Sequence, residues 1–385
     1  ERTSSMTYYF LQNYWWFIIS LLGALLVFLL FVQGANSMIF QLGKTPDDRR
    51  MLINSTGRKW EFTFTTLVTF GGAFFASFPL FYSTSFGSAY WIWLLILFTF
   101  IIQAISYEFQ NKAGNIFGVR TFQTCLIING ILGPLLLGGA VATFFTGSNF
   151  IVEKANITNS MQPVISHWAN GSRGLDVLLN PWVVIFGIAV VFLARILGTL
   201  YINNNVNDDT IRTRVRKQLL VNTILFLLFF LPFLIVTLFS EGYAVNEAGT
   251  IVMEPMKYFN NLLTMWPLAI ILLVGVVLLL FGIIKTILKP NYVRGIWPAG
   301  IGVVCVVLVL FLIAGWNNTA YYPSTADLQS SLTIQNSSSS EFTLKAMFYV
   351  SFLVPFVLAY IVYAWRAIDK KAIDRQEITE DDHAY

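Results

Sequence analysis

The sequence predicts an all-α integral membrane protein with nine transmembrane helices. The prediction rests on the composition, on nine long apolar runs and on an uneven distribution of Lys and Arg. Of the 385 residues, 56% are hydrophobic and 11% are charged, whereas about a quarter of an average soluble domain is charged. A soluble core could not bury so much apolar surface, so the composition excludes a soluble enzyme, a nucleic-acid-binding protein and a disordered regulator.

Each apolar run is long enough to cross a bilayer, which takes about 20 mostly apolar residues. We expect the runs to form one polytopic membrane domain over residues 1–385. The predicted spans are 14–32, 62–83, 90–107, 121–145, 181–202, 218–240, 264–288, 296–315 and 344–365.

Positive charges lie mainly on one side of these nine spans. If the loops alternate between the two sides, 18 of the 24 Lys and Arg residues lie on one side, 5 lie on the other, and Arg195 lies within the fifth span. Cytoplasmic loops are enriched in Lys and Arg. We therefore expect the N-terminus outside, the C-terminus in the cytoplasm, and the polar loops 146–180, 241–263 and 316–343 outside.

A weak internal repeat suggests two four-helix units plus a ninth helix. Asp47-Asp48 precedes the second span and Asp208-Asp209 precedes the sixth, and both pairs are followed by arginines. This pattern fits two units in the same orientation, and it also fits ordinary basic loops with acidic helix starts. Thr45-Pro46 before the first acidic pair predicts a short surface helix, with Thr as N-cap and Pro at the first position.

Cysteine and histidine are too few and too scattered for a metal centre in the membrane. Cys125 and Cys305 lie in separate apolar runs, where free cysteines usually act as small hydrophobic residues. His167 and His383 lie outside the predicted spans. We therefore expect no thiolate metal cluster and no histidine-ligated haem within the membrane part of this chain.

Ionisable groups near the hydrocarbon are the candidate functional residues, because such groups are costly there. Glu61 follows Trp60 at the cytoplasmic start of the second span, where it either admits protons or pairs with a neighbouring basic residue. Glu108 ends the third span at the same face, near Lys112. For Arg195 we expect a structural role, either through a carboxylate on a neighbouring helix or by extending toward the interface.

Several segments resemble subunit II of the cytochrome bd-type quinol oxidases, in the same order along nearly the whole chain. The resemblance rests on the following segments: 48–55, Lys59-Trp60-Glu61, 71–76 with Pro79, Asn180-Pro181, Arg212-Thr213-Arg214, 322–325, 331–334, 337–340 and Thr343-Leu344.

The resemblance implies a subunit of a bacterial cytoplasmic-membrane complex that oxidises quinol and reduces O2 to water. It places two b-type haems and one d-type haem on a partner, subunit I, with a small accessory subunit and a structural quinone or lipid as further components. It implies roles in assembly and in proton and oxygen delivery to haem d. Trp60-Glu61 matches the family's Trp-plus-acid position at the proton entrance, and Glu108 falls where relatives also place an acid.

The sequence departs from the family pattern at the end of the first span. Relatives commonly carry acidic residues there, whereas this chain has Gln33 and Asn36. These amides do not titrate, but they can hold ordered water. Two other functions stay open at this stage: a transporter built from two four-helix units, and a purely structural assembly partner.

Overall fold

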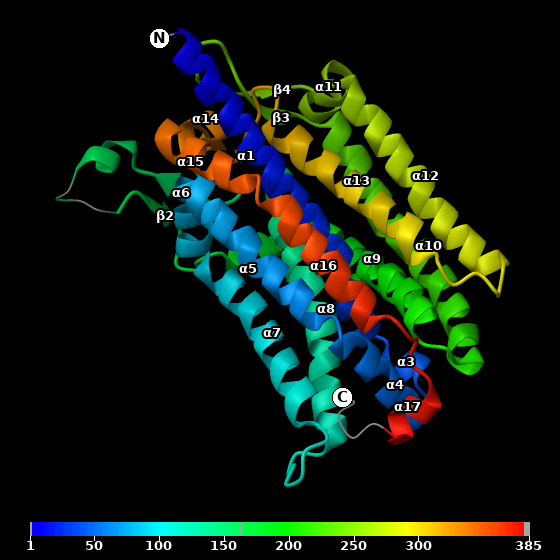
Figure 1. The fold of residues 1–385 in the computed structure, drawn as a ribbon. Helices are drawn as coiled ribbons and strands as arrows, with labels where there is room; N and C mark the ends of the chain where they lie inside the picture. Colours follow the sequence, from blue (N-terminus) through cyan, green and yellow to red (C-terminus); the bar gives the residue numbers. More distant parts are fainter. Residues whose placement is uncertain (1, 160, 162–163, 381–385) are drawn as a thin grey trace.

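Long helices form a bundle, and the structure, a computed structural model, describes residues 2–159, 161 and 164–380 (Figure 1). The long helices are α1 (Arg2–Leu29), α5 (Trp60–Ser77), α7 (Tyr90–Phe109), α8 (Val119–Thr146), α9 (Pro181–Asn205), α10 (Asp209–Phe239), α12 (Trp266–Leu288), α13 (Ile296–Gly315), α15 (Glu341–Ser351) and α16 (Val354–Ile368). The prediction of an all-α membrane protein is confirmed.

The described residues hold seven helical segments that are each long and apolar enough to cross a membrane, and up to nine if two bent pairs are counted as spans. One bent pair joins α5 to α6 (Pro79–Phe81) and η1 (Tyr82–Phe86) at 116°, and the other joins α15 to α16 at 42°. The segments predicted as spans 62–83 and 344–365 are thus each bent at a break in the helix.

Proline explains both breaks. Phe78 precedes Pro79 and adopts φ −133°, ψ 69°, because a residue before proline is disfavoured in the helical region. In the last span, Pro355 has no N–H to donate to the carbonyl group of Ser351, where α15 ends. Both prolines lie inside the predicted spans and are common kink sites in membrane helices, so the sequence marks the two positions without giving the bend angles.

The first span extends beyond its predicted end at residue 32. After an irregular turn at Leu30, the chain continues as α2 (Phe31–Asn36) and α3 (Ile39–Leu42). All six residues of α2 are buried. This extension brings Gln33 and Asn36 into the bundle.

Side-chain caps fix the starts of three helices. Thr45 accepts a hydrogen bond from the Asp48 backbone N–H and begins α4 (Pro46–Gly57), as the sequence predicts. Asn180 caps α9 through the Trp182 N–H, and Asp208 caps α10 through the Ile211 N–H.

The three long polar loops form one end of the molecule, here called the loop end. Each loop carries a two-stranded antiparallel sheet: β1 (Phe150–Val152) with β2 (Ser166–Trp168), β3 (Gly242–Val245) with β4 (Ile251–Glu254), and β5 (Ala320–Tyr322) with β6 (Leu332–Thr333). Bridges between Ser148 and Ser324 and between Ala244 and Thr319 link the loops to one another. Short helices complete this end: η2 (Lys154–Thr158), η3 (Leu175–Leu179), α11 (Lys257–Thr264), η4 (Leu328–Ser330) and α14 (Ile334–Ser337).

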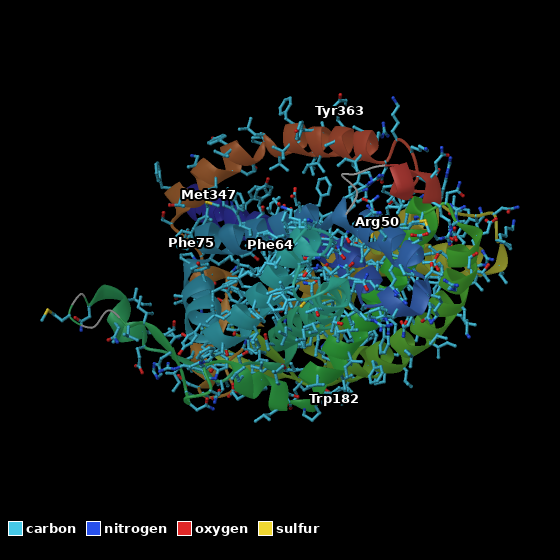
Figure 2. The ribbon with its side chains drawn as sticks, turned by 90° about the horizontal axis from the view of Figure 1, so that it is seen from below. Arg50, Phe64, Phe75, Trp182, Met347 and Tyr363 are labelled. Carbon is cyan, nitrogen blue, oxygen red and sulfur yellow. The ribbon has the colours of Figure 1, made fainter. Side chains whose placement is uncertain are left out.

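The opposite end, here called the basic end, consists of α3, α4, α17 (Arg375–Glu380) and the connections 110–118, 206–208 and 289–295 (Figure 1). Together with the helix ends and short links that adjoin these segments, it contains 18 of the 24 Lys and Arg residues of the chain. Figure 2 views the molecule from below Figure 1 and labels Arg50 on α4 at this end.

Backbone contact between α2 and its neighbours depends on glycine. A Cβ atom at Gly34 would lie 1.7 Å from the Ala194 carbonyl oxygen of α9, and one at Gly198 would lie 2.4 Å from the Ala35 nitrogen. At Gly130 of α8 a Cβ would lie 2.4 Å from the Gln33 carbonyl oxygen. Small residues allow this close approach of membrane helices, and here they enclose α2 between α8 and α9.

A buried lysine attaches the last span at the basic end. The Lys59 side chain is fully buried and forms an ion pair with Asp369, just after α16. Its ammonium also lies 4.4 Å from the ring centre of Trp365, and Asn205 donates a 3.2 Å hydrogen bond to Asp369. No described residue of α16 itself is buried, and Tyr363 lies on its outer face (Figure 2). The ion pair therefore holds a helix that has little other packing.

The C-terminal tail is tied to the basic end by a second set of contacts. Asp48 is 1% exposed and accepts hydrogen bonds from Arg214, at 2.9 Å, and from Arg375 of the tail. Arg375 also pairs with Asp208 at 3.0 Å. Ile373, two residues before Arg375, is fully buried. Its backbone N–H donates to the Asn205 carbonyl oxygen and its carbonyl oxygen accepts from the Asn207 N–H, at 2.8 Å each. The tail is thus an integral part of this end.

We predict that Asp369→Asn destabilises the protein, because it leaves the buried Lys59 ammonium without a counter-charge. Breaking one partner of a buried pair costs about 3–5 kcal/mol, so the thermal unfolding midpoint in detergent should fall clearly. The control is Glu108→Gln, the same chemical change in an ion pair whose members are more than half exposed. An equal effect of both substitutions would contradict a special role for the buried pair.

The Asp48 contacts predict a stability that depends on pH. Burial alone would raise the pKa of the Asp48 carboxyl, but the hydrogen bonds from Arg214 and Arg375 outweigh it and lower that pKa below its ordinary value. The stabilisation is therefore complete above about pH 4, the ordinary pKa of Asp, and is lost as pH falls through the lowered folded-state pKa. Asp48→Asn should lower the unfolding midpoint at pH 6 and have less effect at pH 3. Asp47→Asn, an exposed neighbour, is the control and should show no such difference.

Candidate functional site

The predicted proton-entry residues lie in the first turn of α5. Lys59 is the N-cap of this helix, and Trp60 and Glu61 are its first two residues. Trp60 is half-buried and stacks on Tyr107 of α7, with ring centres 5.9 Å apart and planes 24° apart. This contact joins the starts of the second and third predicted spans at the basic end.

Glu61 is exposed at this position. Among the described residues it forms no ion pair and no hydrogen bond, because the neighbouring Lys59 is committed to Asp369. A free carboxylate at the rim of a helix bundle can exchange protons with water. The expected alternative, a local ion pair of Glu61 with Arg58 or Lys59, is not seen among the described residues.

Glu108 lies in the last turn of α7 and forms an ion pair with Lys112 at 2.6 Å. Both side chains are more than half exposed, so the pair is of the surface type, which contributes little to stability. No contact in the described part of the chain joins Glu108 to Glu61. The structure thus places the two acids at the same end without bringing them together.

Arg195 lies in the buried helix α9 and donates to the side-chain oxygen of Gln41. The expectation of a carboxylate partner is not met among the described residues, and the Nε atom of Arg195 is buried without an acceptor there. The partner is an amide because α3 brings Gln41, rather than an acidic residue, beside α9. The hydrogen bond joins α9 to α3, and a structural role for Arg195 stays a prediction.

Between α2, α7 and α8 the structure assembles a set of buried side-chain amides, here called the amide cluster: Gln33, Asn36, Gln103 and Asn129. All four are fully buried. Gln33 donates to Gln103 and Asn129 at 3.3 and 3.4 Å, and Asn129 donates to the Thr99 carbonyl oxygen at 3.1 Å. Neutral polar groups at this depth in a membrane bundle are costly unless they have partners.

The amide cluster is connected to the basic end through Tyr107. Asn36 donates to the Tyr107 hydroxyl at 2.7 Å, and that hydroxyl donates to Thr56 of α4 at 2.8 Å. Tyr107 is also the residue on which Trp60 stacks. Asn36 and Gln33 lie one turn apart on α2, so polar side chains follow one another in a row from Thr56 of α4 to the middle of the bundle.

Several atoms of the amide cluster have unused hydrogen-bonding capacity. The Oε1 of Gln33, the Oδ1 of Asn36 and the Nε2 of Gln103 are buried and have no partner among the described residues. Buried polar atoms are almost always satisfied by protein or by ordered water, and buried waters usually bind to such groups. The cluster therefore has the chemistry of a water-binding site, with two free acceptors and one free donor.

Sequence reasoning identified Gln33 and Asn36 as water-holding residues but missed Gln103, Asn129 and Tyr107. The side chains of Gln103 and Asn129 carry no charge, so the cost of burying a charge does not mark them in the sequence. The available signal was an amide inside an apolar run, as at Gln103 in Ile101-Ile102-Gln103-Ala104-Ile105 and at Asn129 in Ile127-Ile128-Asn129. The spacing of these residues does not reveal that they meet.

The long helices offer no ligand set for a metal or haem in the described part of the chain. There, no group of three His, Cys, Asp or Glu residues could hold a metal ion. His167 lies in β2 at the loop end, and His383 lies outside the described residues. Cys125 and Cys305 are separate free thiols on α8 and α13.

An enclosed apolar cavity of about 70 Å³ lies between α1, α8, α9 and α13. Its lining is aromatic and aliphatic and includes Leu30, Phe144, Val190 and Phe311. Apolar cavities of this kind stay dry. Leu30 lies one helical turn before Gln33, so the dry cavity and the polar row come close to each other along the same helix.

Comparisons with known proteins agree on one family. The sequence-family model for cytochrome bd terminal oxidase subunit II matches residues 11–368. The chain is 25% identical over 404 residues to cytochrome bd-I ubiquinol oxidase subunit 2 of Escherichia coli K12, covering 98% of this chain and 99% of the relative. It is 22% identical to cytochrome bd ubiquinol oxidase subunit 2 of Bacillus subtilis 168, over 94% of this chain and 98% of that protein.

A solved structure of bd oxidase from Geobacillus thermodenitrificans has the same fold. The match has a TM-score of 0.58 at 11% identity and covers 95% of this chain and 97% of that chain. Since the family match extends over almost all of the sequence, the chain belongs to the cytochrome bd terminal oxidase subunit II family and is a multi-pass subunit of a bacterial cytoplasmic-membrane oxidoreductase.

Proposed function

We propose that this chain is the haem-free half of a bd-type quinol oxidase and that it conducts protons from the cytoplasm through the amide cluster. The observation that carries the proposal is the buried polar row from Thr56 and Tyr107 to Gln33, with unused hydrogen-bonding atoms along it. The family match favours an oxidase subunit over a transporter. The polar row is what supports a role in proton delivery over a purely structural one.

The basic end is proposed to face the cytoplasm. Lys and Arg are concentrated there, and cytoplasmic segments of membrane proteins carry this excess. Counting each bent pair as one span gives up to nine candidate spans. For these we propose two four-helix units and a ninth helix, with the N-terminus outside. The entrance at Glu61 then opens toward the cytoplasmic water.

In the proposed route, Glu61 takes up a proton at the rim and passes it to water beside Trp60 and Tyr107. The amides of Asn36 and Gln33 do not titrate, so they act by holding water molecules in a hydrogen-bonded file. The proton moves along that water, and the hydroxyl of Tyr107 can accept and donate a hydrogen bond at the same time. Glu108 is the second candidate for uptake at this face.

The catalytic haems, two b-type and one d-type, are proposed to lie on subunit I. The placement of histidine supports this, since His167 is in a loop strand and no other described residue is a histidine. Proton uptake from the cytoplasm for the reduction of O2 to water would make the reaction electrogenic. A small accessory subunit and a structural quinone or lipid stay predictions from the resemblance.

The apolar cavity is proposed to serve oxygen. Its volume of about 70 Å³ is enough for a few molecules of the size of water or dioxygen. Because its walls are apolar, O2 is admitted and ions are excluded. Protons and oxygen would then travel by separate, adjacent paths.

We predict that Glu61→Gln lowers quinol:oxygen turnover of the assembled oxidase by about 10-fold, since a positioned proton-transfer group contributes on this scale or above. The haem content, measured from the reduced-minus-oxidised spectrum, should not change. Glu247→Gln, an exposed acid at the loop end, is the matched control and should be neutral. Normal turnover of the Glu61 variant would remove this residue from the route.

The amide cluster is tested by Gln33→Met, which keeps the side-chain volume but removes both polar atoms. We predict a severalfold loss of turnover together with a loss of stability of about 1–3 kcal/mol, because the buried oxygens of Gln103 and Asn129 lose the donor that Gln33 supplies. Gln33→Glu should restore turnover, since a carboxylate also binds water. Asn222→Leu is the control, as Asn222 is a buried amide of α10 outside the cluster. If Gln33→Met destabilises the complex and leaves turnover intact, the cluster is structural.

A further inference from the structure

A hollow at the basic end has the composition of an anion site. It has a volume of about 560 Å³ and lies between α4, the end of α7 and the start of α8. Its charged lining consists of Arg49, Arg50, Arg120 and Asp47. Three guanidinium groups against one carboxylate leave a net positive charge.

The three arginines are not neutralised by the protein. Among the described residues none of them forms an ion pair, whereas Arg214 and Arg375 at the same end both bind Asp48. Arg49 instead donates to the Gly43 carbonyl oxygen at 3.1 Å. The guanidinium groups of Arg49 and Arg120 lie 5.0 and 5.4 Å from the ring centre of Phe40, which fixes two of the three charges at the rim of the hollow.

Two buried donors of the lining lack an acceptor. The Nε of Arg50 and the Nε2 of Gln110 are inaccessible and have no hydrogen-bond partner in the part of the chain that the structure describes. Gln110 is only 2% exposed. Such buried donors are normally satisfied. Both missing partners are acceptors, and oxygen-rich anions supply acceptors in the planar geometry that guanidinium groups bind best.

Exposed apolar residues beside the hollow indicate which kind of anion it suits. Val119 lines the hollow and is 41% exposed, and the preceding Phe117 and Ile116 are 67% and 86% exposed. They lie at the start of α8, where the chain enters the apolar part of the bundle. Acyl chains can cover these side chains, whereas a free anion leaves them in water.

We propose that this hollow binds the phosphate group of an anionic phospholipid, with Arg49, Arg50 and Arg120 as its cationic wall and Gln110 as a neutral donor. Basic pockets between membrane helices are known to bind such headgroups. The acyl chains would lie along Ile116, Phe117 and Val119. The site does not depend on the proton route, because it shares no residue with the amide cluster.

The test uses the purified oxidase complex after delipidation in detergent. Its unfolding midpoint is followed during titration with phosphatidylglycerol, with phosphatidylcholine of the same acyl chains, and with inorganic phosphate. We expect phosphatidylglycerol to raise the midpoint at the lowest concentration. Arg50→Gln and Arg120→Gln should each weaken this response by about fivefold, the effect of one basic residue near an anionic lipid.

Arg216→Gln is the control, an arginine of α10 at the same end but outside the hollow, and it should respond like the wild type. Gln110→Leu keeps the charges and removes the unpaired donor. It therefore still tests the site if the arginine variants fold poorly. Phosphatidylglycerol retained through purification, counted per complex by mass spectrometry, gives a second measurement that does not depend on stability. Undiminished binding in the Arg50, Arg120 and Gln110 variants would overturn the proposal. If inorganic phosphate fully reproduced the response, the hollow would bind a free anion, and the proposal of a lipid site would be overturned.

Discussion

Backbone contact between α2 and α9 is the constraint on which the interior depends. Gly34 lies so close to α9, and Gly198 so close to α2, that a Cβ atom at either position would collide with the backbone of the other helix. Gly130 does the same for α8. This contact extends the first span past Leu30 and directs Gln33 and Asn36 inward. Without it, neither the amide cluster nor the adjacent apolar cavity would exist in this form.

Charges and neutral polar groups are separated in this molecule. Most charged groups lie at the basic end, where Lys59 and Asp48 are buried with counter-charges. Inside the bundle, apart from Arg195 on α9, the polar groups of the described residues are mainly neutral amides and hydroxyls, because an unpaired charge there is far more costly than an amide. A path made of such groups can bind water but cannot store a proton. In the proposed route, protons are therefore bound and released by acidic residues at the rim of the bundle.

Helix α4 is the common support of these features. Asp48 at its start binds the C-terminal tail, Ser55 donates to Asn205 at 2.6 Å, and Thr56 accepts from Tyr107 at the mouth of the polar row. It also carries Arg49 and Arg50, two of the three arginines that line the hollow. One polar helix of 12 residues therefore connects the tail, the polar row and the membrane surface.

The sequence by itself determined the membrane class, the approximate spans, the basic end and the family, since composition, run length and charge are properties of residues taken singly or in order. It also predicted the Thr45-Pro46 helix start, because capping is local. The tertiary structure decided what meets across the bundle. The pairing of Lys59 with Asp369 over 310 residues and the meeting of Gln33 with Gln103 and Asn129 depend on helix packing. Such contacts leave no periodic signal in a single sequence, because every long helix here is apolar on most of its faces.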